Sequence, residues 1–114
     1  MKDHYEGIGQ WAATFACDGV KEGQVVKISG GGSVSPCGGG DSFCGVALSV
    51  GRDEKACAVA LGGLVTTSYT GAAPALGWTG LAADGSGGVK TAEGGRSRLV
   101  VDVDESGSAV TFML

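Results

Sequence analysis

The sequence predicts an all-β fold, a small single-domain β-barrel or sandwich of about eight or nine short strands. Three observations support this prediction. Apolar residues alternate with small or polar ones in short segments, which is the period of a strand, and no helical periodicity of useful length occurs. Glycine occurs 23 times in 114 residues and proline only twice, which favours many tight turns. Hydrophobic residues make up 43% of the chain, which argues against disorder.

The chain divides into a polar N-terminal arm, residues 1–10, and one β-barrel-like domain, residues 11–114. The domain begins with an alternating segment in which Trp11, Phe15 and Cys17 share one face of a strand. The next expected elements are a turn at 18–23, a strand at 24–29, a brief strand around Val34 and a glycine-rich loop at 35–41. Glycine suits such loops because it adopts positive φ without steric cost.

The densest run of strand-forming residues extends from Phe43 to Tyr69 and is broken by the charged segment 52–55. We expect a β-hairpin with its loop at 52–55. The register that places every large apolar residue on one face pairs Val50 with Cys57, Leu48 with Val59 and Val46 with Leu61. A slip of one residue would mix the two faces.

The rest of the chain continues the same pattern after Gly62 and Gly63, which mark a bulge or corner. The expected elements are a strand at 64–69, a loop at 71–77, strands near 81–83 and 89–91 joined by a turn at 84–88, and a closing hairpin at 99–114. In that hairpin a loop at 105–108 pairs Val103 with Val110, Val101 with Phe112 and Leu99 with Leu114.

Charge and hydropathy exclude several classes of partner. The net charge is −4 and the pI is about 4.7, so no basic patch is available to bind nucleic acid. No apolar run approaches the ~20 residues of a membrane-spanning helix, and the N-terminus lacks the apolar core of a signal peptide. We therefore expect a protein made in the cytosol, with its four cysteines reduced.

One short motif suggests catalysis. Gly40 to Phe43, with the letters GDSF, resembles the serine-nucleophile block of one hydrolase class. That chemistry needs a histidine base, usually downstream, whereas the single histidine, His4, lies upstream in the arm. We interpret the motif as a turn that leads into a strand. No nucleophile, base and orienting group assemble elsewhere, so we expect neither an enzyme nor a bound cofactor.

The cysteines are the candidate metal ligands, together with His4, but their spacing argues against a site. Structural zinc sites usually take ligands from close pairs such as C-x2-C, and none of the gaps here is that short. The hairpin register also separates Cys44 from Cys57 by roughly 20 Å. Cys17, Cys44 and Cys57 are therefore expected to be small buried hydrophobic residues. Cys37, in the glycine-rich loop, is the thiol expected to be most exposed.

The acidic and aromatic residues are also interpreted structurally. The acidic groups at 53–54 and 102–105 lack a calcium-loop pattern and are expected in solvated turns and strand faces. Trp11 and Trp78 are expected to pack into the fold. The alternative is that either one anchors an interface, where aromatic residues are enriched.

The order of several turn and strand signatures carries a family resemblance. These are Gly19–Val26, Phe43–Ala47, Val59–Val65, Pro74–Gly77, Gly87–Val89 and the closing hairpin. In this order the chain resembles the small capsid decoration, or cement, proteins of tailed bacteriophages. The resemblance implies a β-barrel-like protein, often a homotrimer, that binds the outside of the major capsid protein lattice and stabilises the head. It would be made in the host bacterial cytoplasm and reside on the virion surface.

The arm is the candidate contact segment with the capsid or a neighbouring subunit, through Tyr5, Ile8 and Trp11. An arm with apolar residues among glycines can pair with a neighbouring strand.

Three alternative functions remain. The protein is a small β-barrel component of a phage tail, baseplate or related assembly, a barrel that binds metal through its thiols, or a hydrolase that uses Ser42 or a cysteine with His4.

Overall fold

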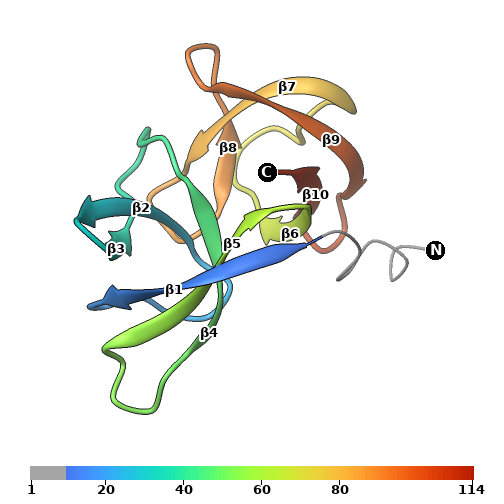
Figure 1. The fold of residues 1–114 in the computed structure, drawn as a ribbon. Helices are drawn as coiled ribbons and strands as arrows, with labels where there is room; N and C mark the ends of the chain where they lie inside the picture. The colour runs from blue at the N-terminus through green and yellow to red at the C-terminus, as the bar shows by residue number, and fades with distance from the viewer. Residues whose placement is uncertain (1–9) are drawn as a thin grey trace.

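A computed structural model of the protein describes residues 10–114 (Figure 1), and this part of the chain is all-β, as predicted. The described residues form ten strands, slightly more than the eight or nine expected, and no helix, so no helix there is available to cross a membrane. The strands are β1 (Trp11–Cys17), β2 (Val25–Gly30), β3 (Ser33–Pro36), β4 (Gly45–Val50), β5 (Ala56–Gly62), β6 (Leu64–Ser68), β7 (Gly77–Ala83), β8 (Val89–Thr91), β9 (Arg96–Asp104) and β10 (Ala109–Met113).

The strands form two sheets of five, which Figure 1 shows as two lobes. The first half of the chain closes into a barrel in the order β1-β3-β2-β4-β5, in which only β1 and β3 pair in parallel. The second half forms a sheet in the order β6-β10-β9-β7-β8. The chain passes from barrel to sheet at Gly62 and Gly63, and Gly63 has a φ of 87°. The glycine pair is thus the corner that the sequence suggested.

Both hairpins have the loops expected from the sequence, but their registers are only partly as predicted. Next to the loops the predicted pairs form, Val50 with Cys57 and Val103 with Val110. Farther away each hairpin contains a β-bulge that shifts the pairing by one residue, so the other predicted pairs are wrong. The observed pairs are Ala47 with Val59, Val46 with Ala60 and Phe112 with Val100.

The bulge in β4 has a physical reason, because both faces of the β4–β5 hairpin are covered. Val50 packs against the barrel core, whereas Val46 belongs to the core of the second sheet and Leu48 packs against it. The requirement that all large residues share one face therefore does not apply to this hairpin. A bulge adds one residue to one strand, bends it and changes which residues face each side.

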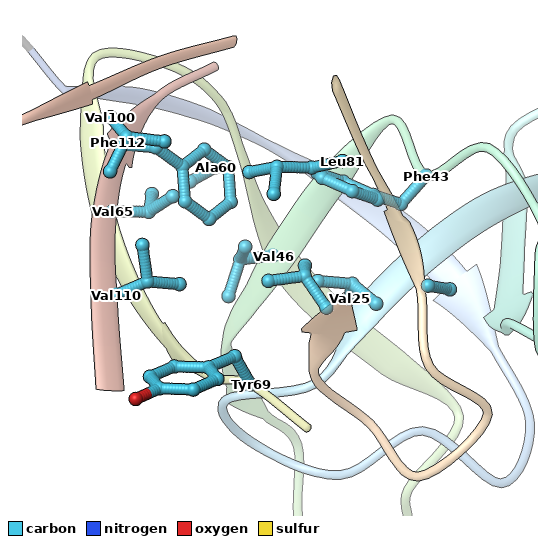
Figure 2. Packing of buried hydrophobic residues seen from close by; sticks show 12 residues of the cluster. Val25, Phe43, Val46, Ala60, Val65, Tyr69, Leu81, Val100, Val110 and Phe112 are labelled. Atoms are coloured by element: carbon cyan, nitrogen blue, oxygen red, sulfur yellow. The ribbon is translucent and has the colours of Figure 1, made fainter. Parts of the chain in front are cut away.

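Two hydrophobic cores meet at this hairpin. The smaller core fills the barrel and includes Val26, Val34, Cys57 and Val59. The larger one lies between the barrel and the second sheet, and Figure 2 shows Val25 and Val46 of the barrel pointing towards Val110 and Phe112. The two lobes therefore share a continuous interior, which favours a rigid body.

Candidate interaction surface

The structure places one of the three predicted contact residues. Tyr5 and Ile8 lie outside the described residues, whereas Trp11 begins β1 and is 60% exposed. Its indole lies over Gly62, its partner on β5, where any side chain would collide with the indole nitrogen. Part of the Trp11 indole therefore rests on the barrel wall at Gly62, while most of the side chain meets solvent.

Trp78 is exposed as well, so the expectation that both tryptophans pack into the fold is wrong. Trp78 lies at the start of β7 and is 67% exposed, and the neighbouring Leu76 is 68% exposed. The alternation of β7 explains this, because Leu81 points into the core and Trp78, three residues away, points to the opposite face.

An apolar row crosses this outer face of the second sheet. Trp78 pairs with Leu99, and Met113 pairs with Leu64. Phe112 pairs with Val100, so the next step of the register sets Met113 beside Leu99. We call Trp78, Leu99, Met113 and Leu64 the apolar row. Its members alternate along their strands with the buried Val100, Phe112 and Val65, so the row faces outward on four adjacent strands.

The row leads towards Trp11 on the barrel, because Trp11 pairs with Gly62, two residues before Leu64. Gln10 joins the same region, since its side-chain amide donates a hydrogen bond of 3.0 Å to the carbonyl oxygen of Leu64. The apolar row therefore leads from Trp78 to the vicinity of Trp11. Trp11, Trp78 and Met113 are exposed, whereas Leu64 and Leu99 are half-buried. Surfaces of this kind mark sites of protein interaction.

A cleft of about 410 Å³ opens beside β6. One wall is the segment Leu64–Thr66, and the other is Val46–Leu48 of the barrel. Gln10, Glu22, Gly23 and Thr111 complete the lining. The hydroxyls of Thr66 and Thr111 share a hydrogen bond of 2.8 Å. The cleft therefore combines apolar side chains, hydroxyls and one exposed carboxylate.

The four cysteines are all free thiols, and burial is as expected for Cys17 and Cys57. The prediction fails for Cys44, which is only half-buried, like Cys37. Burial, with a smaller contribution from the Asp41 carboxylate, raises the pKa of the Cys37 thiol to about 11. Burial also raises the pKa of Cys57 to about 11, to which the neighbouring Cys17 contributes. Such thiols are poor nucleophiles at neutral pH.

The GDSF segment is a turn that leads into a strand, as interpreted from the sequence. Asp41 accepts hydrogen bonds from the Gly38 N–H, at 2.8 Å, and from the Lys27 ammonium, at 2.7 Å. These contacts lower the pKa of Asp41 and raise that of Lys27. Ser42 is exposed, and residues 10–114 include no histidine to serve as its base. In the same part of the chain, no group of three His, Cys, Asp or Glu residues lies close enough to hold a metal ion.

Comparison of the sequence with protein-family models and with curated proteins finds no match. The sequence signal for the exposed surface was present but ambiguous. Leu64, Leu99, Met113 and Trp78 all lie in strand-like segments, and alternation alone does not say which of two apolar faces meets solvent. The cleft had no signal at all, since it depends on how β6 lies beside the barrel.

Proposed function

We propose that this protein is a phage capsid decoration protein, which binds the outside of the major capsid protein lattice and stabilises the head. The observation that carries the proposal is the exposure of Trp78, Met113 and Trp11, which the half-buried Leu99 and Leu64 of the apolar row connect. Large apolar side chains that gather along one face, rather than singly, mark sites of interaction. Tryptophan and methionine are also enriched where proteins meet.

The resemblance in the order of turns and strands supports the same role. A rigid all-β body suits a protein that bridges subunits of a shell, and many copies on one lattice need only a modest interface each, because attachment becomes multivalent. We expect a homo-oligomer, with a trimer favoured, on the virion surface after synthesis in the host bacterium. The acidic net charge agrees with a protein partner rather than nucleic acid.

The test is fractionation of virions from the phage that encodes this chain. The protein should co-sediment with DNA-filled heads and stay absent from isolated tails. Purified protein should also bind heads from which it has been stripped, and Trp78→Ala should weaken that binding by about tenfold or more, as for an interface anchor. Ile28→Ala is the matched control, because Ile28 is also exposed but lies on β2 of the barrel.

The results separate this role from its nearest alternative. Sedimentation with tails or baseplates would support the tail-component hypothesis instead. Absence from every virion fraction would overturn both. Equal loss of binding in Trp78→Ala and Ile28→Ala would show that the apolar row is not the contact surface.

A further inference from the structure

We propose that the exposed edge of β6, together with the cleft beside it, receives an extended segment of the capsid subunit as an added β-strand. This inference rests on the proposed function and names the element of the partner that is recognised. It concerns the cleft lined by β6 and β4, which shares Leu64 with the apolar row.

The first argument is the hydrogen-bond pattern of β6. This strand is at the edge of its sheet and pairs only with β10. The residues that flank β6 both form backbone hydrogen bonds on the β10 side. The Leu114 N–H donates to the Gly63 carbonyl oxygen at 2.9 Å, and the Tyr69 N–H donates to the Ser108 carbonyl oxygen at 3.0 Å. In an antiparallel ladder the bonding residues alternate, so the backbone groups of Leu64 and Thr66 point away from β10.

These outward groups are largely unpaired. Within residues 10–114, no backbone hydrogen bond engages the Leu64 N–H or either backbone group of Thr66. The Leu64 carbonyl oxygen accepts a hydrogen bond from the Gln10 side chain instead, and an added strand would replace this side-chain donor with a backbone N–H. Alternating donors and acceptors spaced along a strand are matched in register only by another extended backbone.

The second argument is the shape and charge of the cleft. The segment Val46–Leu48 faces β6 across it, so an added strand would be held on both sides and would bury apolar side chains against Leu48 and Leu64. Among residues 10–114, Glu22 is the one charged residue in the lining. The occupant is therefore an extended, largely apolar segment with a lysine or arginine placed to reach Glu22.

The test uses Thr66→Pro with Thr66→Val as its matched control. Proline removes the outward N–H of Thr66 and is tolerated on an edge strand whose N–H faces away from the ladder. Valine keeps the N–H, and both variants lose the hydroxyl bond to Thr111. For binding to stripped heads we expect Thr66→Pro to bind about tenfold or more weakly and Thr66→Val to bind like the wild type. Glu22→Gln should reduce the salt dependence of binding.

Hydrogen exchange gives a second readout that does not depend on the proline variant. The Leu64 and Thr66 amides should exchange rapidly in the free protein and at least about tenfold more slowly on heads. Slow exchange of these amides in the free monomer would mean that residues 1–9 of the same chain pair with the β6 edge. Protection of these amides that grows with protein concentration would mean that a second copy of the protein pairs with the β6 edge. Either result overturns the inference.

The two proposals fail differently. If wild-type protein does not bind heads, the proposed function fails and this inference with it. If the wild type binds heads, but Thr66→Pro binds equally well and the edge amides stay exposed, only the strand pairing is overturned.

Discussion

The Arg98 guanidinium lies over the ring of Phe43, with its Cζ 4.8 Å from the ring centroid, and its Nη2 donates a 3.0 Å hydrogen bond to the Phe43 carbonyl oxygen. Arg98 is only 7% exposed, its Nε has no partner, and no described carboxylate pairs with it. Burial lowers the pKa of Arg98. Among residues 10–114, one carbonyl oxygen and one ring face are thus the partners of this buried cation.

This arrangement predicts different outcomes for two substitutions of Arg98. Arg98→Ala removes packing against the Phe43 ring as well as the hydrogen bond, so the free energy of unfolding should fall by about 2–4 kcal/mol. Arg98→Met keeps most of the volume and removes the cost of burying an unpaired charge, so it should stay within about 1 kcal/mol of wild type. Urea unfolding measures both values. Equal losses in the two variants would contradict this account.

The ion pair between Lys27 and Asp41 predicts a dependence of stability on pH. Because the pKa of Asp41 is lowered in the fold, its contribution is present above the ordinary value of 3.8 and is lost as the pH falls through the lowered pKa. The pKa of Lys27 is raised, so its contribution holds below 10.5 and is lost as the pH rises through the raised pKa. The wild type should therefore exceed Asp41→Asn in Tm between these limits.

Thermal unfolding from pH 2 to pH 11 measures this difference, which should narrow at both ends. Asp18→Asn is the control, since the side chain of Asp18 is 92% exposed and lies 3.9 Å from Lys55. Exposed pairs of this kind contribute little, so its Tm should follow that of the wild type. A constant gap between Asp41→Asn and the wild type at all pH values would contradict the assignment.

The sequence was sufficient for the fold class and for most of the strands and turns, because alternation and glycine positions are local properties. It missed the first residues of β7 and β9. Val50 with Cys57 and Val103 with Val110 were predictable because a four-residue loop sets the pairs beside it. The bulges were not predictable, since they depend on which core covers each face of the hairpin. The exposure of Trp78 and the edge of β6 likewise depend on how the two sheets lie together.

Two glycines predict opposite responses to alanine. A Cβ at Gly45 would collide with the Ala60 carbonyl oxygen and lie 2.7 Å from Val59 Cγ1, both inside the barrel wall. Gly45→Ala should therefore lose about 2–3 kcal/mol of unfolding free energy. The three atoms nearest to a Cβ at Gly62 all belong to the Trp11 indole, which is exposed and can swing away. Gly62→Ala should stay within about 1 kcal/mol of wild type.

Fluorescence provides the matching readout for the indole. In a Trp78→Phe background, Gly62→Ala should shift the Trp11 emission to longer wavelength, because the ring leaves the barrel wall. If Trp11 contacts the shell, the same variant should also weaken binding to heads. An unchanged emission spectrum would mean that Trp11 does not rest on Gly62.

The raised pKa of Cys37 predicts slow modification despite its partial exposure. Relative to the ordinary value of 9.0, a pKa of about 11 leaves roughly 100-fold less thiolate at pH 8. Labelling with iodoacetamide, followed by mass spectrometry, should show Cys37 reacting that much more slowly in the folded protein than in 6 M guanidinium. The folded rate should rise about tenfold per pH unit until the pH nears 11. Asp41→Asn should accelerate it, since that change removes the carboxylate that raises the Cys37 pKa and leaves the Lys27 charge unpaired. A folded rate equal to the unfolded rate at pH 8 would show that Cys37 is not shielded by the glycine-rich loop.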